Sequence, residues 1–111
     1  MSEKILKNIQ KEEIVRLAEL VSIQEGQIVS KTLVQNKAVS VTLFAFDKGE
    51  EISSHESDGD AMVTVLEGTG TFIVDGKEYR LSTGETLVMP AKKPHAVYGE
   101  ECFKMSLVVI F

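Results

Sequence analysis

The sequence predicts an all-β protein, a small antiparallel β-barrel preceded by a short N-terminal helix. After residue 26 the chain consists of short segments rich in β-branched and aromatic residues, with turn residues between them. No segment of helical periodicity separates these segments, which argues against a parallel α/β sheet. The 111 residues are 43% hydrophobic and 26% charged, as expected for one globular domain with its own core.

The first part of the chain, residues 1–26, differs from the rest and is predicted to be a helical segment. Ile14, Leu17 and Val21 recur at intervals of three and four residues, which is typical of an amphipathic helix. We therefore predict a short helix within residues 10–20. Its apolar stripe needs a surface to cover, either the flank of the barrel or a second subunit.

The barrel itself is predicted over residues 27–111. The strand-like runs share β-branched or aromatic residues and end at Gly, Asp, Asn or Pro. They lie at 27–35, 38–46, 61–68, 69–76, 77–81, 85–90 and 103–111. Asp75-Gly76 is the strongest hairpin signal, because a type I′ turn needs positive φ at both central residues.

Several of these strands are apolar on both faces, among them the segments at residues 41–46 and 106–111. One face of each would fill the barrel interior, and the other would need a second sheet or subunit to avoid aggregation. The sequence therefore predicts a homodimer, formed through an exposed sheet edge or a swapped strand.

Composition excludes several classes of function. The net charge of −5 argues against nucleic acid, which requires clustered Lys and Arg, and the only dense basic pair beyond the N-terminal segment is Lys92-Lys93. No apolar run has the length of a membrane span or a signal peptide. The single Cys102 follows two glutamates that disfavour a thiolate, so we expect a non-catalytic cysteine and a reducing, cytoplasmic location.

The chain has two histidines, His55 and His95, and each follows a turn and precedes a β-like segment. Positions so far apart in sequence can face one another across the interior of an antiparallel barrel. We therefore expect the two imidazoles to meet.

The residues around the first histidine form a spaced pattern. Gly49 is followed after five residues by His55, then by Ser57 and Ala61, and after six more residues by Gly68. This pattern resembles the first motif of the cupin superfamily, in which glycine, His-x-His, glutamate and glycine stand at these intervals. Ser57 replaces the second histidine of the motif, and Ala61 replaces the glutamate.

The second histidine has a matching pattern. Gly84 is followed after five residues by Pro90, then by Lys92, His95 and Gly99. It resembles the second cupin motif, with Lys92 at the place of a glycine and Gly99 at the place of an asparagine. With the flanking strands, the resemblance covers residues 27–111 and implies a barrel of jelly-roll type.

The resemblance also implies which residues could hold a divalent metal such as Zn, Fe, Mn or Ni. Of the motif ligands, only His55 and His95 are present. Asp58 and Asp60 have the opposite strand parity and would need a bulge at Gly59 to point inward. Catalytic zinc usually keeps three protein ligands, and facial-triad iron needs two histidines and a carboxylate.

Three functions follow as hypotheses, because the fold by itself does not choose among chemistries. The favoured one is a small organic ligand bound by His55, Ser57 and His95 on apolar walls. The alternative is a metal-dependent isomerase, decarboxylase or dioxygenase acting on a small polar substrate. The third is a structural or regulatory dimer with an empty barrel.

Two further sets of residues bear on that pocket. Phe44, Phe103 and Met105 are interpreted as core in preference to ligand lining. Lys92 and Lys93 lie on a loop that should reach the barrel mouth, where a solvated turn is the simpler interpretation and contact with an anionic ligand is the alternative.

Overall fold

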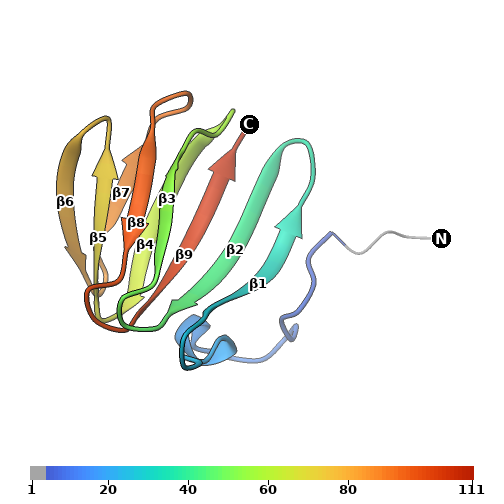
Figure 1. Ribbon diagram of the computed structural model, residues 1–111. Coiled ribbons are helices and arrows are strands. Elements are labelled where there is room, and N and C mark those ends of the chain that lie inside the picture. The colour runs from blue at the N-terminus through green and yellow to red at the C-terminus, as the bar shows by residue number, and fades with distance from the viewer. Residues whose placement is uncertain (1–4) are drawn as a thin grey trace.

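The computed structural model describes residues 5–111 and contains one short 3-10 helix and nine strands. The elements are η1 (Leu17–Leu20), β1 (Ile28–Gln35), β2 (Val39–Phe46), β3 (Glu51–His55), β4 (Asp60–Glu67), β5 (Thr69–Val74), β6 (Lys77–Ser82), β7 (Thr86–Met89), β8 (His95–Tyr98) and β9 (Phe103–Ile110). The strands form two sheets, with the orders β1-β2-β9-β4-β7 and β3-β8-β5-β6. Figure 1 shows the two sheets facing each other as layers.

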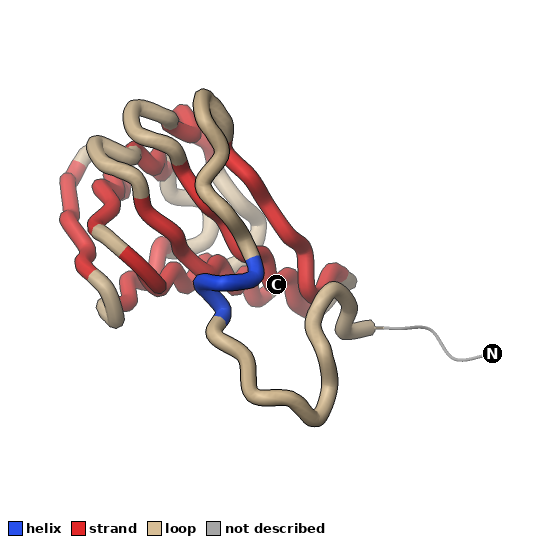
Figure 2. The backbone as a smooth tube through the Cα atoms, turned by 90° about the horizontal axis from the view of Figure 1, so that it is seen from below, coloured by secondary structure: helices blue, strands red, loops and turns tan. Residues whose placement is uncertain are grey.

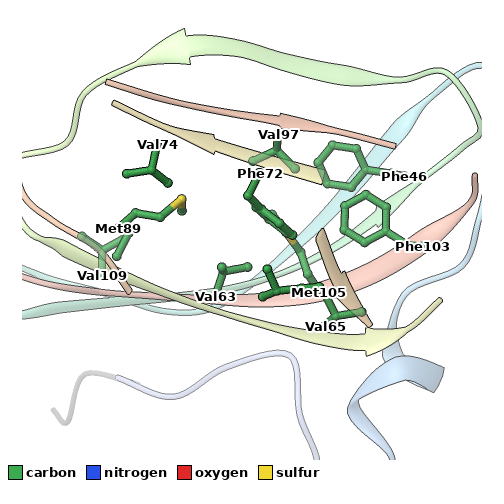
Figure 3. Packing of buried hydrophobic residues seen from close by; sticks show 12 residues of the cluster. Phe46, Val63, Val65, Phe72, Val74, Met89, Val97, Phe103, Met105 and Val109 are labelled. Carbon is green, nitrogen blue, oxygen red and sulfur yellow. The ribbon is translucent and has the colours of Figure 1, made fainter. Parts of the chain in front are cut away.

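Every strand pair is antiparallel, which confirms the predicted all-β class and the jelly-roll arrangement. The core lies between the sheets because alternate side chains of each strand point inward. One end of the core is closed by Phe46 and Phe103, whose rings stack with centroids 4.7 Å apart. Val74, Met89 and Val109 lie toward the other end (Figure 3).

The predicted hairpin at Asp75-Gly76 is confirmed. Asp75 has φ of 50° and Gly76 has φ of 83°, the positive values that a type I′ turn requires. The turn brings Val74 opposite Lys77 and sets the β5–β6 register, with Phe72 opposite Tyr79. Lys77 and Tyr79 therefore share the inward face of this sheet with Val74 and Phe72.

The predicted N-terminal helix within residues 10–20 is reduced to the four residues of η1. The backbone is extended at Arg16 and again at Val21, so the helix extends to neither side. The residues of the expected apolar stripe do not share one buried face: Val21 is buried, whereas Ile14 is fully exposed. Figure 2 shows η1 as a short helical piece between long loops.

The segment nevertheless covers part of the five-stranded sheet. Val21 belongs to a small second core with Leu33, Leu43 and Ala45, which point outward from β1 and β2. Lys104 on β9 donates a hydrogen bond of 2.7 Å from Nζ to the carbonyl oxygen of Ala18. The barrel's own flank is thus the surface that these N-terminal residues cover.

The described residues, 5–111, include no helix with the length and apolar character needed to cross a membrane.

Candidate functional site

The structure brings His55 and His95 together on neighbouring strands. His55 ends β3 and His95 begins β8, and the two residues are opposite each other in the antiparallel register. Their ring centroids are 4.3 Å apart, with an edge-on angle of 65° between the ring planes. The expectation that they would face each other across the interior is wrong in this respect, because β3 and β8 are adjacent in one sheet.

A bulge in β3 aims His55 at its partner. Ile52 pairs with Val97 and His55 pairs with His95, so β3 uses one more residue than β8 between these two pairs. The bulge keeps His55 on the same face as Ile52, Val97 and His95. The irregularity that matters for the site therefore lies within β3.

The two rings differ in burial. His95 is 3% exposed and lies opposite the buried Val74 of β5, which places it on the core face of the sheet. His55 is exposed, because β3 is the terminal strand of this sheet. The pair therefore extends from the core to the solvent.

Hydrogen bonds fix the tautomer of each ring. Nδ1 of His55 is 3.0 Å from the carbonyl oxygen of Ser53, and Nδ1 of His95 is 3.2 Å from that of Lys93. A carbonyl oxygen only accepts, so each Nδ1 carries the proton and donates it. In the neutral ring, Nε2 is then a lone-pair acceptor.

Burial holds the pKa of His95 below its usual value of 6.5, because the interior disfavours the charged ring. The hydrogen bond to Lys93 opposes this shift, and the nearby His55 adds to it. His95 is therefore neutral at pH 7, and its Nε2 can accept a hydrogen bond or coordinate a cation.

Ser57 makes its hydrogen bond to the backbone of its own loop. Its hydroxyl donates a hydrogen bond of 2.6 Å to the carbonyl oxygen of Gly59, two residues along the chain. The serine that was expected to serve a ligand thus has its proton engaged within the β3–β4 connection. Its oxygen keeps only acceptor capacity.

Asp58 and Asp60 bond to the β7–β8 loop. Asp60 accepts a 2.8 Å hydrogen bond from the backbone nitrogen of Ala91, and Asp58 lies 3.4 Å from Nζ of Lys92. The inward bulge at Gly59 is absent, and Asp60 keeps the outward parity opposite Ile110. Neither carboxylate therefore completes a coordination set with the imidazoles.

No group of three or more His, Cys, Asp or Glu side chains within residues 5–111 is arranged to hold a metal ion. The donor set of the site is two imidazoles. It falls short of the three protein ligands of catalytic zinc and of the two histidines and carboxylate of facial-triad iron.

Apolar side chains fill the interior beyond the site. Phe103 and Met105 are each 1% exposed and belong to the core (Figure 3). Phe44 is partly buried and packs against this core. These residues are thus core, as the sequence suggested.

Sequence reasoning missed a hollow of about 390 Å³ beside the histidine pair. It lies at the seam where β6, the last strand of one sheet, approaches β7, the last strand of the other. Its lining consists of Val74, Asp75, Lys77, Tyr79, Leu87, Val88, Pro90 and Lys93. Neither imidazole lines the hollow. Val74 and Lys93 connect the two, because both line the hollow and both contact His95: Val74 pairs with it across the strands, and the carbonyl oxygen of Lys93 accepts its hydrogen bond. Only the strand pairing, which is a long-range property, could have revealed this seam.

The backbone around the histidines retains the conformation that the spaced glycines predicted. Gly49, Gly68 and Gly84 have φ between 82° and 88°. Lys92, at the place of a motif glycine, also has positive φ, at 66°. The site therefore keeps its supporting frame while it departs from the usual ligand set.

Comparison with known protein families gives a match to the part of the chain that contains this frame. The family described as "Cupin domain" matches residues 42–111. No match was found among curated proteins.

Solved structures resemble the whole chain. A conserved protein of unknown function from Streptococcus pyogenes is 43% identical, with a TM-score of 0.95 over 99% of this chain and 96% of that one. A cupin superfamily protein from Desulfitobacterium hafniense is 34% identical, with a TM-score of 0.91 over 96% and 97% of the two chains.

A cupin 2 conserved barrel domain protein from Leptotrichia buccalis is 47% identical, with a TM-score of 0.83. The match covers 85% of this chain and 46% of that one, so the relative is about twice as long.

Proposed function

Because the chain belongs to the cupin domain family, we propose that it binds a small organic ligand at the imidazole pair of His55 and His95. The observation that carries this proposal is the shared tautomer: both Nδ1 atoms donate to backbone carbonyls, which leaves an Nε2 acceptor on each of two rings whose centroids are 4.3 Å apart. Such a pair suits a ligand with a hydroxyl or another hydrogen-bond donor.

The surroundings support this function. The pair has neutral His95 on one side and open solvent at His55 on the other, so a ligand can enter without unfolding the core. Val74 and Val97 flank His95 with apolar surface on the inward face. A donor group shielded by these side chains would form a hydrogen bond in a medium of low dielectric constant, where it is stronger than in water.

The test is a thermal-shift screen of hydroxylated organic acids and sugars, repeated with chelator. A ligand at 100 times its Kd stabilises the folded state by about 2.7 kcal/mol, which a melting curve resolves. We expect the shift to persist in chelator and to disappear in His55→Ala. Glu51→Ala is the matched control, because Glu51 is exposed on the same strand but faces outward opposite Tyr98.

Metal-dependent catalysis, the main alternative, is tested by elemental analysis of the purified protein. Protein purified without chelator or metal-affinity resin would then carry near-stoichiometric metal, and His55→Ala would lose it. An absence of both metal and ligand shift would support the third hypothesis, a structural or regulatory dimer.

Two expectations accompany the proposed function. We propose that two copies associate through the outer face of the five-stranded sheet, where Val41, Val108, Met62 and Val88 are aligned across neighbouring strands. Met62 is 38% exposed and Val88 is 54% exposed.

A cytoplasmic location is proposed from Cys102, a free and exposed thiol that a reducing compartment would preserve.

A further inference from the structure

The hollow between β6 and β7 contains the ammonium group of Lys77. The ammonium group of Lys77 lies 5.1 Å from the centroid of the Tyr79 ring. None of the ion pairs formed within residues 5–111 includes Lys77. The ring contact is a weak attraction that an anionic ligand can supplement without displacing it.

The remaining charges of the hollow leave it positive. Lys93 and Asp75 form a long ion pair of 3.7 Å, and both side chains are more than half exposed. With Lys77 the lining carries two positive charges and one negative charge, whereas the whole protein has a net charge of −5. The seam is therefore a local site of attraction for anions on an acidic molecule.

The other lining side chains suit a compact apolar group. Val74, Leu87, Val88 and Pro90 contribute hydrocarbon surface, and Tyr79 contributes the face of a ring. A volume of about 390 Å³ lies within the range of small-molecule sites. The hollow thus combines apolar walls with a net positive charge, which favours a small amphipathic acid over an inorganic anion.

Strand register connects this hollow with the histidines. His55 pairs with His95, His95 pairs with Val74, and Val74 pairs with Lys77, so the four residues form one row across the inward face of the sheet. Adjacent strands are about 4.8 Å apart, which places the backbones of His95 and Lys77 about 10 Å apart. One small molecule can span this separation, since the lysine side chain shortens it.

We propose that the hollow binds the carboxylate of a small hydroxylated organic acid, with Lys77 as the residue that pairs with the carboxylate. The apolar body of the acid lies against Val74, Leu87 and Tyr79, and its hydroxyl reaches toward the imidazole pair. The last step rests on the proposed function, whereas the carboxylate site stands on the hollow itself.

The test compares 4-hydroxybenzoate with its neutral analogue 4-hydroxybenzamide on the full chain, by calorimetry and by NMR titration. We expect the acid to bind at least tenfold more tightly than the amide and to shift the resonances of Val74, Tyr79 and Leu87. Lys77→Gln should remove this preference while leaving the affinity for the amide unchanged. Lys37→Gln, an exposed change in the β1–β2 turn, should behave as the unmodified protein does.

Equal affinities for acid and amide, or equal effects of Lys77→Gln and Lys37→Gln, would overturn the carboxylate site. The histidine signals report separately on the proposed function. If the hollow responds through Lys77 but the ring signals of His55 and His95 do not move, and benzoate binds as tightly as 4-hydroxybenzoate, the carboxylate site is supported and the imidazole site is refuted. If the rings respond and Lys77 has no effect, the reverse holds.

Discussion

Lys92 occupies a backbone conformation that glycine adopts more easily. Its φ is 66°, in the left-handed region, where a Cβ approaches the following carbonyl oxygen. The cupin motif has glycine at this place. Glycine adopts positive φ without strain, whereas Lys92 adopts it with strain. The exposed ion pair of Lys92 with Asp58 compensates little, because such pairs contribute about 0–1 kcal/mol.

Lys92→Gly should therefore raise the free energy of unfolding by up to about 1 kcal/mol, as the relieved strain exceeds the added chain entropy. Urea denaturation measures the change. Lys93→Gly is the matched control, since Lys93 is next in the chain without positive φ, and it should lower stability. Equal losses of stability in both variants would show that Lys92 is not strained by its positive φ.

His95 should make folding stability depend on pH. Its pKa is below 6.5 in the folded protein, so below pH 6.5 the unfolded chain binds the proton first. This contribution to stability is complete above pH 6.5 and decreases as the pH falls toward the lowered pKa of the folded state. The direction follows from burial, which disfavours the charged ring.

His95→Gln should be less stable at pH 7 yet lose less stability between pH 7 and pH 5, because glutamine does not titrate. Chemical denaturation at several pH values gives the two slopes. Identical slopes for the two proteins would show that His95 is not protonated on unfolding in this interval.

At the scale of elements, the close approach of β5 to β9 depends on one missing side chain. A Cβ on Gly70 would lie 2.6 Å from Cε2 and 2.8 Å from Cζ of Phe103. Phe103 is held in place, since its ring stacks on Phe46 and meets the edge of Phe72 with centroids 6.1 Å apart. The glycine thus allows the aromatic end of the core to close.

Gly70→Ala should lower the free energy of unfolding by about 1–3 kcal/mol, the usual cost of overpacking a core. Combining it with Phe103→Leu should cost less than the sum of the two single changes, because the smaller side chain removes the clash. Additive costs in thermal or urea unfolding would place the strain elsewhere.

At the scale of the whole molecule, the outer face of the five-stranded sheet has one part that the N-terminal residues cover and one part that is exposed. The N-terminal residues cover its β1–β2 side, where Leu33 and Leu43 are buried. Toward β7 the same face leaves Met62 and Val88 exposed. A second copy would shield this part, which is the physical basis of the proposed homodimer.

Sedimentation analysis should accordingly find a dimer at micromolar concentration and a monomer for Met62→Lys. Glu51→Lys, on the outer face of the other sheet, should leave the dimer intact. A monomer over a wide range of concentrations in the unmodified protein would exclude this interface.

The sequence alone determined the features that depend on local chemistry. Runs of β-branched and aromatic residues between turn residues specified the strands, and Asp75-Gly76 specified a type I′ hairpin, because both depend on neighbours in the chain. The glycine and histidine spacing identified the cupin frame and its incomplete ligand set. The N-terminal helix was overestimated, since three apolar residues at helical spacing do not settle the conformation of a segment: its backbone is extended at Arg16 and Val21, and Val21 packs on the sheet.

Only the tertiary structure decided which side chains meet. It placed His55 beside His95 in one sheet, engaged Asp58 and Asp60 with the β7–β8 loop, and opened the seam that Lys77 lines. These outcomes depend on strand order and register, and a shift of one residue would have turned each side chain to the opposite face. Pairing between distant strands is set by the packing of the complete core, so no short stretch of the chain contains it.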